Sequence, residues 1–203
     1  MSEHLYPITI PAGETVVKEI LFEPGHDTYF VGVYADEGAT ARIMVRADAI
    51  AGMLYITTKL APGSRIFIGV CAQLSGSSNL AIHSFQWHES PHATSRVWVR
   101  KIISDEAVAT YQGLIHVAKG AVGTIVSQDD KTLLDGAKAR AESQPILEVL
   151  NNDVVCSHGS ALGRIDEQMI WYMQTRGVTA GSARALIYEA FFDEVCANVL
   201  SEG

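Results

Sequence analysis

Cysteine is scarce in this sequence: Cys71, Cys156 and Cys196 stand far apart in a chain of 203 residues. An odd number of widely spaced cysteines does not make a disulfide framework, so we expect a reducing compartment, the cytoplasm. A run of about eighteen apolar residues is also missing, which excludes a helical membrane span. The first residues carry neither a basic stretch nor an apolar one, so the sequence predicts no secretion signal.

Basic residues are few as well, with 15 Lys and Arg against 23 Asp and Glu and a formal net charge of −8. A phosphate backbone needs clustered positive charge, so nucleic acid is not the expected partner. The chain has no Walker A or G-x-G-x-x-G sequence to hold a nucleotide, and the Gly-Ser pair at residues 159–160 lacks the spacing of a nucleophile elbow. With 48% hydrophobic and 19% charged residues, the composition indicates one globular core with a small appendage.

Short apolar or alternating runs, separated by turn residues, dominate the first two thirds of the chain. They are rich in Val, Ile, Thr, Tyr and Phe, and no 3.6-residue periodicity interrupts them, so the pattern predicts an all-β body. A strand spacing of about ten residues fits a sandwich, a jelly roll or a β-solenoid equally well, and no strict repeat selects among them. The predicted strands are residues 16–22, 29–34, 41–46, 53–58, 65–71, 80–87, 96–102, 114–117, 123–126, 146–149 and 154–156.

The last third of the chain reads differently. Residues 129–144 are predicted to form a loop with one helical turn. After Arg164 the apolar spacing becomes helical: Asp166 caps a first helix, and Arg176 and Gly177 end it. Thr179 caps a second helix that ends near Ser201. Its expected apolar stripe comprises Ala183, Leu186, Ile187, Ala190, Phe191 and Val195, with Tyr188 and Phe192 off the stripe.

Cys156 and His158 are the first candidate site. Residues two apart in an extended segment point to the same face, so the pair can present sulfur and nitrogen to one metal ion. The spacing alone favours the other interpretation, a buried thiol beside a hydrogen-bonded imidazole. A second candidate is the set His83, His88 and His92, which lacks metalloenzyme spacing because Pro91 prevents a shared helix face. We interpret this set as a loop or strand edge.

Six segments of the C-terminal third stand in a specific order: residues 128–134 (QDDKTLL), 145–149 (PILEV), 153–159 (DVVCSHG), 163–168 (GRIDEQ), 171–173 (WYM) and 176–177 (RG). This combination resembles the SufB/SufD family of the SUF iron–sulfur cluster assembly machinery. The Cys-Ser-His-Gly form is similar to the SufD side of the family. The SufB side carries a glutamate where this chain has Gly159, and a cysteine near the position of Asp130.

The resemblance implies a mostly β fold, with a right-handed parallel β-helix over residues 1–163 and a pair of helices over residues 164–203. It implies that the β-helix dimerises with the His158 region at the interface, and that the two helices dock onto an ABC-type ATPase, SufC. His158 is then an imidazole ligand for iron, Cys156 a second ligand or a sulfur-handling thiol, and Asp130 an outside candidate. The residues implied for the docking surface are Asp166, Tyr172, Arg176, Gly177, Tyr188, Phe191 and Phe192.

Three functions follow as hypotheses. In the first, the protein is a scaffold that holds a transient iron–sulfur cluster, is not itself an enzyme, and works with a SufC-type ATPase. The chain has about half the usual length for the family, so we expect a homodimer rather than pairing with a SufB- or SufD-like relative. In the second, the protein is a structural β-solenoid partner of the ATPase and binds no cluster. The third, a small metal-dependent enzyme, would use His83, His88 and His92.

Overall fold

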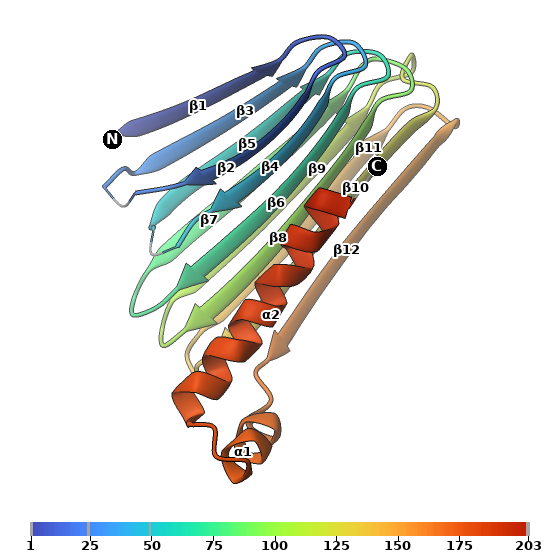
Figure 1. The fold of residues 1–203 in the computed structure, drawn as a ribbon. Helices are drawn as coiled ribbons and strands as arrows, with labels where there is room; N and C mark the ends of the chain where they lie inside the picture. The colour runs from blue at the N-terminus through green and yellow to red at the C-terminus, as the bar shows by residue number, and fades with distance from the viewer. Residues whose placement is uncertain (1, 24, 49, 202–203) are drawn as a thin grey trace.

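The structure, a computed structural model, describes residues 2–23, 25–48 and 50–201. This part of the chain forms twelve strands followed by two helices (Figure 1). The strands are β1 (Glu3–Ile10), β2 (Thr15–Leu21), β3 (Thr28–Ala35), β4 (Thr40–Arg46), β5 (Gly52–Leu60), β6 (Arg65–Leu74), β7 (Asn79–His88), β8 (Thr94–Ser104), β9 (Val108–Val117), β10 (Thr124–Asp135), β11 (Arg140–Val149) and β12 (Val154–Arg164). The helices are α1 (Glu167–Thr175) and α2 (Ala180–Ser201), and no helix in the described ranges is long and apolar enough to cross a membrane.

The strands wind into a β-solenoid. Each strand pairs in parallel with the strand two further along the chain, so the odd-numbered strands form one six-stranded sheet and the even-numbered strands form another. We call these the odd sheet and the even sheet. In Figure 1 the coils stack from β1 at one end to β11 and β12 at the other. The predicted mostly β fold, a parallel β-helix followed by two helices, is confirmed.

The coils lengthen along the chain, which explains why the sequence shows no strict repeat. Glu3 lies beside Thr28 and Thr28 beside Met53, a step of 25 residues. Near the other end, Gln112 lies beside Gln144, a step of 32 residues. Alternate residues of each strand face the space between the sheets and stack on their counterparts in the next coil. They make a large apolar core, and buried polar residues and a second small apolar cluster occupy the later coils.

One corner of the solenoid is a ladder of left-handed residues. Gly13, Gly38, Gly63, His92 and Gly123 have φ between 57° and 72°, and the amide of each donates to a carbonyl of the next coil. Glycine adopts this conformation freely, whereas a side chain at this position is strained. The exposed His92 therefore occupies a position that the other coils give to glycine.

Helix α2 covers the middle of the even sheet, where it packs on β4, β6 and β8 (Figure 1). Gly69 permits the close approach, since a Cβ there would lie 2.4 Å from a methyl group of Val195. The buried residues of α2 are Ala183, Phe192, Val195 and Val199. The predicted stripe was wrong in part, because Leu186 is 50% exposed and Phe192 is only 5% exposed. Because α2 is apolar on several sides, its sequence alone does not determine which side faces the sheet.

The predicted loop at residues 129–144 was also wrong. Strand β10 continues to Asp135, and β11 begins at Arg140, so strand structure occupies most of that range. The inward-facing residues of β10 include Gln128, Asp130 and Thr132, which are polar although they are buried. Their polarity conceals the alternation that identifies a strand. Strand β1 was not predicted, and β12 runs to Arg164, well past the predicted end at residue 156.

Candidate functional site

The last coil brings the sequence-predicted ligands onto one face. Along β12, Cys156 lies beside Val126, His158 beside Gln128, and Ser160 beside Asp130 of β10. The three β10 residues are buried and face the interior, so their β12 neighbours face the same side. Strands β11 and β12 end their sheets, and within the described residues no further coil covers them. The interior of the solenoid is therefore open at this end.

Cys156 is the inner of the two predicted ligands. Its side chain is half-buried and packs against the small apolar cluster that contains Val126. Burial raises the pKa of the Cys156 thiol. The group is therefore a protonated thiol at neutral pH, and a metal ion must displace its proton before the sulfur can bind.

His158 is exposed at the open end of the solenoid. Solvent or a bound ion can therefore reach its imidazole, which is a common metal ligand in its neutral form. Cys156 and His158 do face the same side, as their spacing predicted. They differ in access, because the histidine stands in the opening and the cysteine partly behind it.

Asp130 lies deeper, with 1% of its surface exposed. Its Oδ2 accepts a hydrogen bond of 3.0 Å from the ammonium of Lys101, which is fully buried. Burial lowers the pKa of Lys101, and the carboxylate of Asp130 opposes that effect. Asp130 Oδ1 is buried and has no hydrogen-bond partner among the described residues. One oxygen of this carboxylate thus balances an internal charge while the other remains available.

A single chain does not complete a metal site from these residues. Among the described residues, no group of three or more His, Cys, Asp and Glu side chains is placed to hold a metal ion. A structural or catalytic metal ion normally takes at least three protein ligands. Cys156, His158 and Asp130 are therefore parts of a site that needs further ligands.

Gly159 lies against the side chain of Asp129 on the outer face of the even sheet. A Cβ at this position would lie 2.8 Å from Asp129 Oδ1. The Asp129 carboxylate is held in turn by Arg100, at 2.7 Å, and Arg100 also pairs with Glu194 of α2 at 3.3 Å. A larger residue at position 159 must disturb this ion-pair network, which links the sheet to the helix.

The structure does not bring His83, His88 and His92 together. His83 lies on the outer face of the odd sheet, where its ring stacks on Tyr55 at 4.9 Å. His88 faces the interior and is fully buried, and burial lowers its pKa to about 4. His92 occupies the left-handed corner. The third hypothesis, a metalloenzyme built on these three residues, has no geometric support in the described chain.

The helical hairpin begins and turns as predicted. Asp166 Oδ1 accepts a hydrogen bond of 2.9 Å from the Gln168 amide at the N-terminus of α1. Arg176 follows the last turn of α1 and donates to the Tyr172 hydroxyl at 3.2 Å. Gly177 takes the left-handed conformation with φ of 87°. The interhelical turn is thus fixed by its own side chains and leaves the outside of the hairpin free.

The predicted docking residues of α2 divide into two kinds. Tyr188 and Phe191 are half-buried, and the Tyr188 hydroxyl donates to Asp135 Oδ2. Phe192 packs against the sheet and leaves little surface for a partner. Sequence reasoning missed the residues that do present apolar surface on the hairpin. These are Met169, Trp171 and Leu186, which together with Tyr172 are between 50% and 65% exposed.

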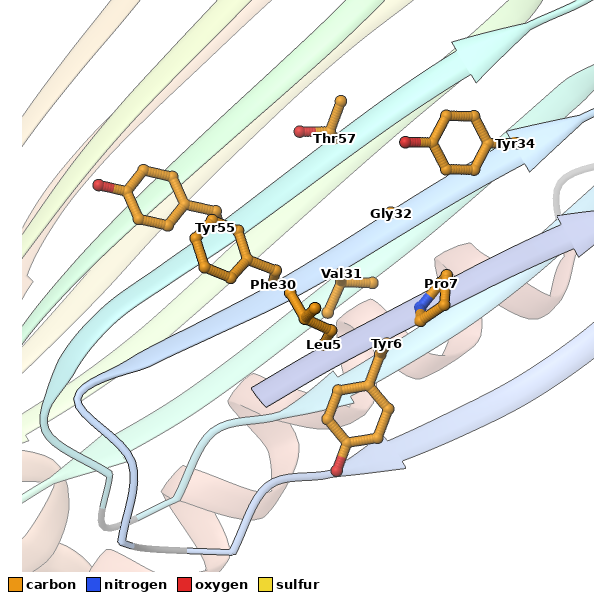
Figure 2. A pocket seen from close by; sticks show the side chains of 9 residues that line it. All are labelled: Leu5, Tyr6, Pro7, Phe30, Val31, Gly32, Tyr34, Tyr55 and Thr57. Carbon is orange, nitrogen blue, oxygen red and sulfur yellow. The ribbon is translucent and has the colours of Figure 1, made fainter. Parts of the chain in front are cut away.

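A separate hollow lies on the outer face of the odd sheet, at the end of the solenoid away from β12 (Figure 2). It has a volume of about 240 Å³ and is lined by side chains of β1, β3 and β5. The rings of Phe30 and Tyr55 stack beside it at 5.0 Å, and Gly32 leaves a notch between its neighbours (Figure 2). Its lining contains no carboxylate, imidazole, thiol or ammonium group, so the hollow is not a metal or acid–base site.

Comparison with known proteins gives a consistent family match. A family model described as SUF system FeS cluster assembly, SufBD core domain, matches residues 30–191. The iron-sulfur cluster assembly protein SufD of Escherichia coli (strain K12) is 36% identical over 116 residues, which cover 57% of this chain and 27% of the relative.

Two further relatives agree. An iron-sulfur cluster assembly SufBD family protein of Synechocystis is 28% identical over 122 residues, which cover 60% of this chain and 27% of the relative. The SufD protein of Bacillus subtilis is 28% identical over 102 residues, which cover 50% of this chain and 23% of the relative. The chain therefore spans about a quarter of the length of the curated relatives it matches.

Proposed function

The chain belongs to the SufBD core family of the SUF iron–sulfur cluster assembly system, and on that premise we propose that it is a scaffold subunit of cluster assembly. In this role the protein holds a cluster in transit and catalyses no reaction itself. The observation that carries the proposal is the open last coil, where Cys156, His158 and Asp130 share the inner face. The three cysteines are free, which suits a reducing cytoplasm.

A second copy of the chain is the proposed cover for the open coil. The inward-facing apolar residues there are left in solvent: Leu162 is 59% exposed and Leu147 is 40% exposed. The terminal strands β11 and β12 also offer backbone groups that pair readily with another strand. A two-fold dimer at this end would bring two copies of His158 and Cys156 to one interface and supply the ligands that one chain lacks.

Iron and sulfide are the cargo in this proposal. His158 supplies a neutral imidazole to iron from its exposed position. Cys156 supplies either a thiolate, once a metal ion has displaced its proton, or a thiol that carries sulfur. Asp130 is a possible oxygen ligand, which would hold iron less tightly than a thiolate holds a cluster. Loose binding suits a scaffold, because the cluster must leave.

The helical hairpin is the proposed docking site for a SufC-type ABC ATPase. Asp166 caps the start of α1, Arg176 and Gly177 form the turn after it, and the exposed Tyr172 adds to the apolar surface of Met169, Trp171 and Leu186. Large apolar residues that stay exposed on one small hairpin favour an interaction surface. Tyr188, Phe191 and Phe192 support the surface from below, because they anchor α2 to the sheet. Movement of the ATPase would then reach the sheet through α2.

The test of the scaffold function is anaerobic reconstitution of the purified chain with iron and sulfide. We expect visible absorbance from a cluster in the wild type and loss of most of that absorbance in His158→Ala. The control is His83→Ala, which removes an imidazole from the outer face of the odd sheet. Unchanged cluster content in His158→Ala contradicts the ligand assignment.

The two interfaces are tested by a matched pair of variants. Leu162→Arg places charge in the open coil, and Leu186→Arg places it on the hairpin, at residues of similar exposure. We expect Leu162→Arg to give monomers in light scattering and to keep the ATPase in co-purification. We expect the opposite from Leu186→Arg. Equal behaviour of the two variants in both assays contradicts the separation of the two surfaces.

A structural partner that binds no cluster is the second candidate function. Two observations favour it: the described residues of one chain complete no metal site, and Gly159 leaves no room for an added carboxylate without disturbing Asp129. It predicts a protein that remains colourless after reconstitution and still co-purifies with the ATPase. A coloured wild type that bleaches in His158→Ala excludes it.

A further inference from the structure

A small pocket opens inside the last coil, beside the residues of the proposed cluster site. Its volume is about 140 Å³, and it lies where β10, β11 and β12 meet. Five of its eight lining residues carry oxygen, and none carries a nitrogen or sulfur donor in its side chain. The lining residues are Asp130, Thr132, Ala141, Glu142, Ser143, Ser160, Ala161 and Leu162.

Two oxygens of this lining are buried without a hydrogen-bond partner among the described residues. They are Asp130 Oδ1 and the Ser143 hydroxyl. A buried carboxylate oxygen without a partner is unfavourable unless a ligand or water satisfies it. Native proteins leave few such atoms, and a bound ion or water is one explanation for those that remain. Asp130 is 1% exposed, so bulk solvent does not meet this need.

The chemistry of the lining selects the class of occupant. Carboxylate and hydroxyl oxygens are the ligands of hard divalent cations, whereas soft ions prefer thiolate and imidazole. Asp130 supplies the one inward-facing negative charge of the lining, and its Oδ2 is paired with the ammonium of Lys101. The second oxygen, Oδ1, is the one that can meet a cation, and the nearby ammonium keeps that attraction weak.

We propose that this pocket is an oxygen-ligand site for a hydrated divalent cation. Asp130 Oδ1 is the anionic ligand, and the hydroxyls of Ser143 and Ser160 bind the ion directly or through its water shell. The affinity expected from so few charges is low, with a dissociation constant of about 10⁻⁴ to 10⁻³ M. The natural ion is ferrous iron, and this one assignment rests on the proposed function. The site lies one row of side chains away from His158. Because it binds weakly, it can receive iron and pass it on.

The test uses Mn²⁺, a hard divalent ion that does not oxidise during the measurement. Mn²⁺ is titrated into the purified chain of 203 residues, and the free ion is followed by electron paramagnetic resonance. We expect one saturable site per chain in the wild type. Ser160→Val removes an oxygen and fills the pocket with methyl groups, and we expect it to weaken binding about tenfold or more. Asp130→Asn should abolish the site.

Ser160→Val leaves the ion pair between Lys101 and Asp130 in place, so it decides the outcome even if Asp130→Asn fails to fold. His83→Ala, which removes an imidazole from the outer face of the odd sheet, is the matched control, and we expect it to bind Mn²⁺ as the wild type does. The proposal is overturned if the wild type shows no saturable binding, or if Ser160→Val binds with unchanged affinity. If Mn²⁺ binds as expected but His158→Ala still retains a cluster, the scaffold assignment of His158 fails and the cation site stands.

Discussion

Protonation of His88 is expected to destabilise the solenoid in mild acid. The His88 Nε2 lies 2.7 Å from the hydroxyl of Ser95, and Ser95 donates its only proton to Gln86 Oε1, also at 2.7 Å. The histidine must therefore donate from Nε2, which leaves Nδ1 without a proton. Nδ1 is buried and has no partner among the described residues. A proton added there creates an imidazolium that neither solvent nor an acceptor stabilises.

The size of the effect follows from the pKa of His88, which burial lowers from 6.5 to about 4. Between these two values the unfolded chain binds more protons than the folded chain, so stability falls as the pH falls. The contribution of His88 is fully present above pH 6.5 and is lost towards pH 4. From pH 7.5 to pH 5 we expect a loss of about 2 kcal/mol from this residue, out of about 3 kcal/mol in total.

Urea denaturation at pH 7.5 and at pH 5 measures the loss, and His88→Gln provides the comparison. Glutamine keeps a hydrogen-bonding side chain for Ser95 but does not titrate. The carboxylates and the other histidines affect both proteins alike, so the difference between the two isolates His88. We expect the wild type to lose about 2 kcal/mol more than His88→Gln. Equal losses in the two proteins would refute the reasoning.

Three further predictions concern the fold. Lys101→Met should lower the free energy of unfolding in urea by about 3–5 kcal/mol, because it leaves the buried charge of Asp130 alone. Adding Asp130→Leu should recover most of that loss, since an apolar pair costs less than a lone buried charge; a double variant as unstable as the single one contradicts this. His92→Gly should raise stability by up to about 1 kcal/mol by relieving a φ of 57°. Thermal melts measure both variants, and Asp105→Gly should gain less stability than His92→Gly, because the Asp105 side chain (φ 56°) also accepts a backbone hydrogen bond of 2.8 Å. Gly69→Ala should push α2 from the sheet, so amide hydrogen exchange should become faster in α2 while the strands keep their protection. An equal rise in exchange throughout the chain contradicts this.

Local patterns predicted the elements that depend on local chemistry. The two terminal helices followed from the caps at Asp166 and Gly177, which the structure confirms. Most strands followed from their apolar alternation and turn residues. The solenoid did not follow from these patterns, because its coils vary from 25 to 32 residues and leave no strict repeat. Only the resemblance to a known family selected it from the possible all-β folds.

The site was harder to predict because its partners lie one coil apart. In the sequence alone, Asp130 resembles a residue of a solvated turn. Only the fold shows that it pairs with Lys101, 29 residues earlier. Tyr111 and Gln128 are likewise distant in sequence, and they meet inside the solenoid across the two sheets. Registers of this kind come from the stacking of coils, and short-range spacing does not encode them. That Cys156 and His158 face the same side was predictable because their relation is local.

The position of α2 also bears on how the molecule comes apart. In a solenoid each coil touches only its neighbours, so the terminal coils can fray while the centre stays folded. Helix α2 packs on β4, β6 and β8, three successive strands of the even sheet, and Arg42 of the first of these donates to the carbonyl of Val199 at 2.7 Å. Glu194 of the helix also pairs with Lys131 of β10 at 2.8 Å. The helix therefore acts as a splint that makes the central coils melt together. Strands β1 and β2 at one end and β11 and β12 at the other lie outside this set of strands, and they are where the chain should open first.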